Sequence, residues 1–216
     1  MTFTVVVGRL LNRVMFGTLA LFMASTCTVA LPALADQTEG TCPKGWYVSG
    51  SAKDYYVSQL EPGVTHDNLP VASIKFRQPK DRGPLPSDGF GTVMQNFDAK
   101  NYTGKRVRFS GLVSTKDVTD GAGLWLRIDG LKGSLGFDNM QDDKRRLHGT
   151  SDFTPCSLVL DVPSEASSIA LGVLLNGKGD VSVCKLKFET VGLDVPVTAN
   201  SNYPPEPRNL DFKDKN

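Results

Sequence analysis

The sequence contains little histidine and little cysteine, and this limits the chemistry that it can carry. It holds two histidines, His66 and His148, and four cysteines among 216 residues. His66 lies in a polar stretch and His148 precedes a Gly-Thr turn, so neither fits the base of a Ser-His-Asp triad. There is no Gly-x-Ser-x-Gly, no His-Glu-x-x-His, no Cys-x-x-Cys and no phosphate-binding glycine loop. The common signatures of hydrolases, metalloproteases and nucleotide-binding proteins are therefore excluded.

An excess of either charge is also lacking. The chain has 24 Lys and Arg against 23 Asp and Glu, a formal net charge of +1. Proteins that bind nucleic acid or anionic lipid through electrostatics carry a basic patch or stripe, which this sequence does not show. We therefore expect no nucleic-acid partner.

The only long apolar run lies at the N-terminus. Arg9 and Arg13 give a basic start, residues 14–31 are mostly apolar, and Ala33-Leu34-Ala35 has the small-x-small pattern of a cleavage site. This predicts a signal peptide over residues 1–35 and a secreted or periplasmic protein. The run contains hydroxyl residues and lacks a basic stop-transfer flank, so no membrane span is expected.

Cleavage after Ala35 leaves about 180 residues, enough for one domain with a sizeable core. The removed segment holds two of the basic residues and none of the acidic ones, so the remaining chain has a formal charge of −1. It retains Cys42, Cys156 and Cys184. In an oxidising compartment these predict one disulfide and one free thiol. Three pairings are open; Cys156 with Cys184 is favoured because both lie at strand-like positions. A catalytic thiol or a metal ligand is the alternative.

A two-faced strand pair lies near the centre of the sequence. Residues 124–129 alternate between apolar Leu or Ile and the residues Trp125, Arg127 and Asp129, a period of two that is typical of a strand. Residues 131–134 supply a turn, and residues 135–139 form a second strand. The pair predicts a hairpin whose outer face carries an aromatic ring and charged groups.

Short strands separated by turn signals occupy most of the remaining chain. They are expected at residues 46–48, 71–76, 92–97, 105–114, 157–162, 169–175 and 181–189. Residues 78–91, rich in proline and glycine, form a surface loop. This spacing predicts an all-β protein, a jelly-roll β-sandwich of two antiparallel sheets over residues 36–194. Residues 195–216 have four prolines and no period, so we expect an extended or loose C-terminal tail.

The sequence resembles a bacterial jelly-roll domain similar to galactose-binding-like domains and carbohydrate-binding modules. The resemblance covers nearly all of residues 36–216 and rests on GFGTVMQ (89–95), YTGKRVRFSG (102–111), AGLWLRID (122–129), FDNM (137–140), GTSDF (149–153), LDVP (160–163), GVLLNGKG (172–179) and PRNLDF (207–212). It implies a galactose-binding-like sandwich of a kind found alone, in exported proteins and attached to transcriptional regulators. The chain departs from the pattern where Phe153, Cys156, Ser182, Cys184 and Lys185 replace expected aromatic rings and carboxylates.

A jelly-roll order would place several polar side chains and Trp125 on one sheet face. Sugars are bound by a flat aromatic ring together with amides, carboxylates or guanidinium groups. The candidate ligand-binding residues are Trp125, Arg127, Asp129, Gln95 and Asn139, and Gly172 on a neighbouring strand would leave room for the ligand. The expected function is an exported, non-catalytic module, with a carbohydrate or a cell-envelope glycan as its partner.

Three alternatives stay open at this point. In the first, Arg127 and Asp129 form ion pairs with each other or with Arg106 and Arg108 across strands. Trp125 is then covered by the 78–91 loop, the tail or a protein partner, which gives a protein-interaction or structural module. Asp129 and Asp138 would form a hydrolase site if they faced one cleft about 5 to 10 Å apart. Asp138 and Asn139 either order a turn or supply oxygen ligands to a structural calcium ion; no other cofactor is expected.

Overall fold

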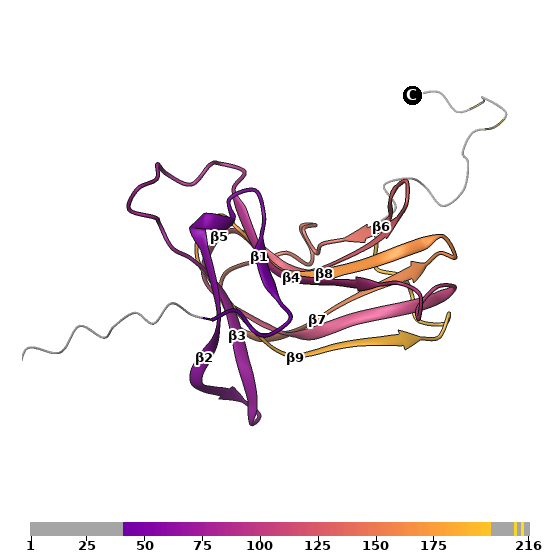
Figure 1. Ribbon diagram of the computed structural model, residues 1–216, viewed down its shortest axis with the longest axis horizontal. Helices are drawn as coiled ribbons and strands as arrows, with labels where there is room; N and C mark the ends of the chain where they lie inside the picture. The colour runs from indigo at the N-terminus through magenta and orange to yellow at the C-terminus, as the bar shows by residue number, and fades with distance from the viewer. Residues whose placement is uncertain (1–40, 200–209, 211–212, 214–216) are drawn as a thin grey trace, which may run out of the picture. The chain divides into compact units, whose positions relative to one another are not determined.

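The computed structural model describes residues 41–199, 210 and 213, and the strands in this part of the chain are arranged around β5, Lys105–Gly130 (Figure 1). The predicted signal peptide and most of the predicted tail lie outside the described residues. The other elements are β1 (Tyr47–Ser49), the short 3-10 helix η1 (Lys53–Tyr55), β2 (Tyr56–His66), β3 (Leu69–Phe76), β4 (Phe90–Asp98), β6 (Gly133–Asp138), β7 (Leu147–Val162), β8 (Ala166–Asn176) and β9 (Asp180–Val191).

β5 takes part in both sheets of an antiparallel sandwich. Its first part, residues 105–116, lies between β7 and β9, and the second sheet has the order β7-β5-β9-β3-β2. Its last part, residues 121–130, lies between β8 and β6, and the first sheet has the order β1-β4-β8-β5-β6. Between these parts the register shifts and Asp117 has a positive φ of 53°, as expected where a strand bends from one sheet into the other. The two sheets are thus continuous through β5, and together they form one curled antiparallel sheet of jelly-roll type.

The core lies between the two sheets and is made by alternate residues. In β5 the inward side chains include Phe109, Leu124, Leu126 and Ile128, all buried. Facing residues of β7 and β8 complete it, with Leu158, Ile169 and Leu175 fully buried. The period of two in the sequence therefore gives the correct inward face of β5. Trp125 belongs to a separate small apolar cluster on the outer face of the first sheet, with Met94, Ala170, Leu174 and Phe90.

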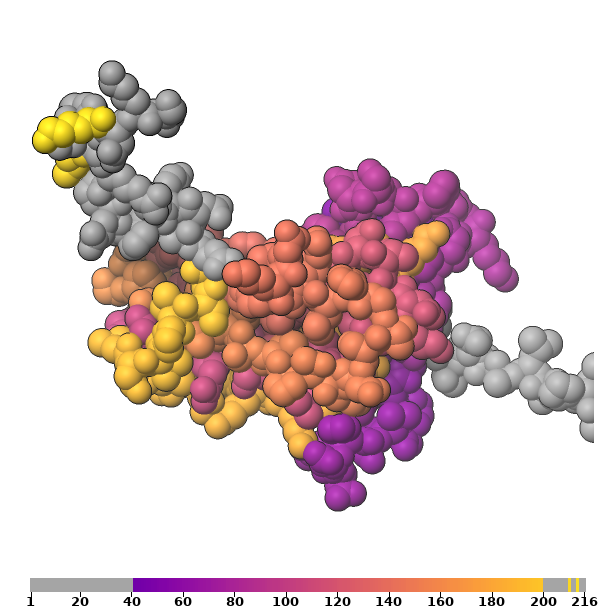
Figure 2. All heavy atoms as spheres, turned by 180° about the vertical axis from the view of Figure 1, so that it is seen from behind, coloured from indigo at the N-terminus to yellow at the C-terminus, as the bar shows by residue number. Residues whose placement is uncertain are grey.

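One strand, β2, is absent from the sequence prediction, and another, β7, is longer than predicted. β2 runs on to His66 and forms a projecting hairpin with β3, visible at the lower edge of Figures 1 and 2. Leu60, Val64 and Leu69 of this hairpin are exposed. The hairpin therefore lacks the alternation of buried and exposed residues from which a strand is predicted. β7 begins at Leu147, ten residues before the predicted strand, and its early part pairs with the bend of β5. Most residues of this early part are polar, so the sequence shows no apolar alternation there.

The favoured disulfide between Cys156 and Cys184 is wrong: both are free thiols, and so is Cys42. Cys156 pairs with Gly111 of β5 from one side, while Cys184 pairs with Leu112 of β5 from the other. The two cysteines are thus two strand spacings apart, about 10 Å, whereas a disulfide needs Cα atoms within about 7 Å. The sequence pattern predicts that each cysteine lies in a strand, but it does not show that β5 lies between these two strands.

The start of the predicted tail lies along β7. Thr198 donates its backbone N–H to the Val159 carbonyl (3.0 Å), and its hydroxyl accepts from the Val159 N–H (2.7 Å). The Arg106 guanidinium donates to the carbonyls of Leu193 and Val195 (2.8 and 2.7 Å) and pairs with Asp161. Residues 193–198 are therefore held on the second sheet.

Candidate functional site

A single row of residues crosses the outer face of the first sheet. Tyr47 of β1 pairs with Met94 of β4, Met94 pairs with Gly172 of β8, and Gly172 pairs with Trp125 of β5. Directly paired residues point to the same face of a sheet, so this row presents a phenol, a thioether and an indole on one surface.

The indole of Trp125 lies across Gly172 and reaches β4. Its Nε1 donates a hydrogen bond to the Thr92 hydroxyl (2.7 Å), which in turn donates to the Val173 carbonyl (2.9 Å). A Cβ at position 172 would lie 2.6 Å from Nε1. We expect from the sequence that a ligand occupies the space above Gly172. In the structure Trp125 itself fills this space and is 7% exposed.

A hollow of about 720 Å³ opens above this row, within the range of small-ligand sites. We call it the Trp125 hollow. It is lined by Tyr47, Ser49, Gly50, Phe90, Thr92, Met94, Trp125, Arg127, Phe137, Asn139, Leu174 and Asn176. Met94, Trp125 and Leu174 form an apolar cluster at its base. Tyr47 and Phe137 come from the two opposite edge strands, β1 and β6, and are 44% and 49% exposed. The hollow thus has a buried apolar base and two exposed aromatic walls.

Arg127 is the one charged residue among those that line the Trp125 hollow. Its Nε donates to the Asp129 carboxylate at 2.8 Å. Its two terminal nitrogens have no partner in the described part of the chain, so they remain available as a fork of donors. The predicted ion pair therefore exists, and it orients Arg127 without using up its hydrogen-bonding capacity.

Asn139 is placed at the hollow by an ordered loop that follows β6. The buried carboxylate of Asp138 accepts two hydrogen bonds from the Arg145 guanidinium, at 2.8 and 2.9 Å. These bonds, with those to Asp142, raise the pKa of Arg145 despite its partial burial. The Asn139 side-chain oxygen accepts from the Gln141 N–H (3.2 Å). Asp138 and Asn139 therefore order a turn, one of the two roles that the sequence leaves open.

The same loop is tied to β8 by one further bond, from the Asn176 amide to the Gln141 side-chain oxygen at 2.8 Å. Among the described residues no group of three or more His, Cys, Asp or Glu side chains is placed to hold a metal ion. The loop is thus ordered by hydrogen bonds and an ion pair of the chain itself.

Gln95 does not lie with the other candidate residues. It pairs with Leu171, and Leu171 pairs with Leu126, so it shares the inward face with core residues. The residue of β4 in register with Trp125 is Met94, and a shift by one position moves a side chain to the opposite face. The expected placement of Gln95 on the Trp125 face is therefore corrected, whereas Trp125, Arg127 and Asn139 do line one hollow.

Asp129 and Asp138 do not face each other. Asp138 pairs with the buried Leu126 and points to the inner face, where Arg145 neutralises it. Asp129 follows Arg127 by two residues and points to the outer face. A β-bulge between Ile128 and Asp129 changes the register that an ideal hairpin would have. The two carboxylates thus do not form the pair that a glycosidase needs.

The aromatic walls of the hollow were not among the predicted site residues. Phe137 lies within the predicted hairpin, and Tyr47 lies within the first predicted strand, but neither strand's neighbours are known from sequence. The strand order places these two residues at opposite edges of one sheet. The positions that depart from the family pattern lie elsewhere: Phe153 and Ser182 line a hollow over the second sheet.

No protein-family model matches the chain. The chain is 37% identical over 181 residues to an uncharacterized HTH-type transcriptional regulator, YbfP, of Bacillus subtilis (strain 168); the match covers 80% of this chain and 57% of that protein, so the chain spans little more than half of this relative.

Among solved structures it is similar to a xylan-binding domain of carbohydrate-binding module family 22 (TM-score 0.49, 12% identity, 70% of this chain and 90% of that one). It is also similar to the C-terminal family 22 module of Clostridium thermocellum Xyn10B (TM-score 0.47, 10% identity, 71% and 90%). A family 4 module is a further neighbour (TM-score 0.43, 13% identity, 71% and 91%). No helix among the described residues has the length and apolar character of a membrane span.

Proposed function

We propose that this protein is an exported, non-catalytic binding module that recognises a glycan, most simply one of the cell envelope, in the Trp125 hollow. The observation that carries the proposal is the convergence of Trp125, Arg127 and Asn139 on one open hollow between two exposed aromatic rings. These residues come from β5 and the end of β6, and the strand order supplies the rest of the surface.

The chemistry of the hollow matches what sugars require. The exposed rings of Tyr47 and Phe137 offer flat apolar surfaces for the C–H faces of pyranose rings. Arg127 and Asn139 offer donors to hydroxyl oxygens, and the bonds to Asp129 and Gln141 fix their positions before a ligand arrives. Preorganised polar groups beside aromatic surfaces increase affinity because less freedom is lost on binding.

Binding assays on the chain that begins at Asp36 test the proposal. We expect retention by purified peptidoglycan or by at least one polysaccharide in a panel, measured by pull-down and affinity electrophoresis. Phe137→Ala should weaken binding at least about fivefold, corresponding to ~1 kcal/mol for the loss of one aromatic contact. Phe153→Ala is the matched control, because Phe153 lies on the second sheet. Equal weakening by both variants would contradict the assigned site, and no binding to any polysaccharide would contradict the ligand class.

A protein-interaction module is the second candidate, favoured by the exposure of two aromatic rings on opposite edges of one sheet. In that case a partner protein would cover Tyr47 and Phe137. The described tail residues do not do so, since they lie along β7. A protein that co-purifies with the wild type but not with Phe137→Ala, together with no retention by polysaccharides, would favour this candidate over glycan binding.

A further inference from the structure

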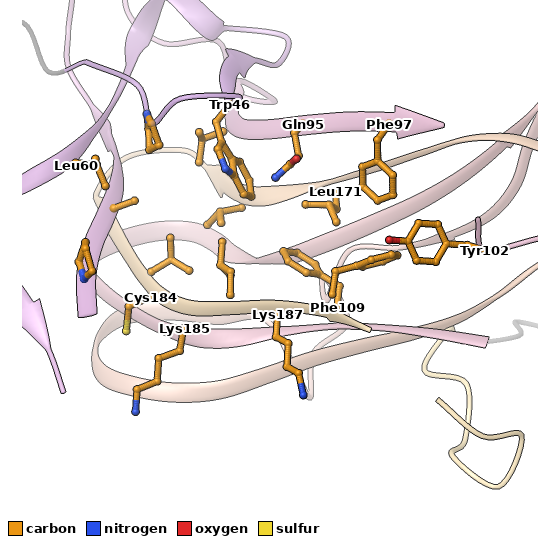
Figure 3. A pocket seen from close by; sticks show the side chains of 18 residues that line it. Trp46, Leu60, Gln95, Phe97, Tyr102, Phe109, Leu171, Cys184, Lys185 and Lys187 are labelled. Carbon is orange, nitrogen blue, oxygen red and sulfur yellow. The ribbon is translucent and has the colours of Figure 1, made fainter. Parts of the chain in front are cut away.

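A second cleft lies between the two sheets, on the side where β4 and β9 face each other (Figure 3). We call it the inter-sheet cleft. It has a volume of about 560 Å³ and is reached from outside, and its deepest walls are buried core residues such as Phe109, Leu171 and Val173. Nothing in the Trp125 hollow belongs to it, because the two sites lie on opposite faces of β4.

Within the described residues, three polar groups that line the inter-sheet cleft have no hydrogen-bond partner. The Trp46 indole N–H, the Gln95 amide and the Tyr102 hydroxyl line it, and no hydrogen bond joins these side chains to any other group in the described residues. Figure 3 shows the Gln95 amide and the Tyr102 hydroxyl directed into the cleft. Half-buried polar groups in a mostly apolar space gain most from a ligand that hydrogen-bonds to them.

Charged groups line the rim of the cleft but do not enter it. Lys185 pairs with Asp67, and Lys187 pairs with Glu189 at 2.6 Å. Figure 3 shows both lysine side chains directed away from the space between β4 and β9. The interior therefore offers no charge for an ionic ligand to pair with, and an ion placed there would lose its hydration without compensation.

Aromatic packing closes one end of the cleft. The rings of Phe97, Tyr102 and Phe188 meet edge to face, with centroids 5.0 to 5.8 Å apart. Leu60, Pro70 and Ala72 of the β2–β3 hairpin line it as well. The apolar surface is thus continuous from these rings to the hairpin, and the polar groups are confined to a few points on it.

We propose that the inter-sheet cleft is a second binding site, for an uncharged and largely apolar small molecule that carries hydrogen-bond acceptors. The Trp46 N–H is a donor only, and the Gln95 amide has two donor hydrogens against one acceptor oxygen, so the cleft offers more donors than acceptors. The volume is that of a small-molecule site. This site is independent of glycan binding in the Trp125 hollow.

Nile red, an uncharged planar dye with a carbonyl acceptor, is a suitable probe, and the protein supplies its own reporters. The sequence has two tryptophans, one in each site. In Trp125→Phe the remaining emission comes from Trp46, and in Trp46→Phe it comes from Trp125. At saturating dye in each variant, which corrects for the donor that Trp46→Phe removes from the site, we expect one dye bound per chain and much stronger quenching of Trp46 than of Trp125. Preferential quenching of Trp125, or binding that does not saturate, would overturn the proposal.

Variants at Gln95 test the polar contact and the volume separately. Gln95→Leu keeps the shape and should weaken dye binding about two- to tenfold, the range for one lost hydrogen bond. Gln95→Phe should fill the cleft and weaken binding more. Asn96→Leu, one residue along β4 and on the opposite face, is the matched control and should bind the dye as the wild type does. Equal dye affinity in all three variants would contradict the assignment.

A second copy of the chain is the competing occupant of this apolar cleft. Sedimentation velocity over a range of protein concentrations distinguishes it from a small molecule. A monomer at all concentrations that binds the dye supports the proposal. A dimer that forms at the expense of dye binding, and that Gln95→Phe abolishes, would overturn it.

Discussion

Trp125 lies over Gly172, with its indole nitrogen 2.6 Å from where a Cβ of residue 172 would be. This close approach lets the indole cross β8 and bond to Thr92 on the strand beyond it. The base of the hollow is therefore shared by three strands, and it depends on the absence of a side chain at one position of β8.

Gly172→Ala should displace the indole and destabilise the protein by about 1–3 kcal/mol, the usual cost of overpacking. The new Cβ would also meet the Val93 carbonyl at 2.6 Å, so the backbone cannot easily yield. Urea unfolding measures the loss, and a red shift of tryptophan emission reports the displaced ring. Gly136→Ala is the control, because its Cβ would meet nothing closer than 3.7 Å. Equal stability of the two variants would contradict this packing.

Arg145→Met should destabilise the protein by about 3 kcal/mol, because it leaves the buried Asp138 carboxylate without its cation. Asp138→Asn alone should cost less, since it leaves a neutral group that can still accept a hydrogen bond. A double-mutant cycle with urea unfolding isolates the coupling between the two residues. Additive losses would show that the pair does not order the loop that carries Asn139.

Raising the pH should destabilise the fold through Tyr56. Its hydroxyl shares one donated hydrogen between the carbonyls of Gly89 and Gly177 (3.0 and 2.7 Å). Burial, with a smaller contribution from Asp120, raises its pKa to about 12. The unfolded phenol has a pKa of about 10. The contribution of Tyr56 is thus fully present below about pH 10 and is lost as the pH rises toward about 12.

Urea unfolding at a series of alkaline pH values checks this dependence. Tyr56→Phe should be less stable at neutral pH, because it loses the shared hydrogen bond, but it should lose less further stability between about pH 10 and pH 12. Tyr47→Phe, at an exposed position, should follow the wild type. If Tyr56→Phe lost as much stability as the wild type between about pH 10 and pH 12, other groups would be responsible for the pH dependence.

The alternation of apolar and polar residues predicts those strands that have one buried face, and it predicts which face is buried. The all-β class, the hairpin of β5 and β6, and the inward face of β5 follow from the period of two at Leu124, Leu126 and Ile128. The projecting hairpin and the early part of β7 do not, because few of their side chains are fully buried and apolar.

The sequence alone does not show which distant strands pair with each other, or in which register. The position of Gln95 on the inner face and the strand that separates Cys156 from Cys184 both depend on register, and a one-residue change reverses the face. Phe137 and Tyr47 become partners in one hollow only through three intervening strands. The sequence therefore predicts Trp125, Arg127 and Asn139 as residues of the hollow, but not its aromatic walls.

All three cysteines of the chain that begins at Asp36 should be found as thiols. Burial raises the pKa of Cys156 to about 11, and it also raises the pKa of Cys42 and of Cys184. Because the thiolate is the reactive form, Cys156 should be alkylated slowest in the folded protein. Unfolding in urea without a reductant should expose three reactive groups by mass spectrometry. Uptake of a single label would instead show a disulfide.

Asp129→Asn separates a binding role from a hydrolytic one. Asp129 holds the Nε of Arg127, so its loss should leave the fold intact and weaken glycan retention about two- to tenfold, through a less well-oriented guanidinium. The matched change Asp143→Asn, at an exposed carboxylate of the loop after β6, should have no effect on retention.

Since Asp138 faces the other side of the sheet and is neutralised by Arg145, neither the wild type nor Asp129→Asn should release reducing sugar from a bound polysaccharide. Release by the wild type that Asp129→Asn abolishes would show that Asp129 acts in hydrolysis without Asp138, and the module would then be an enzyme.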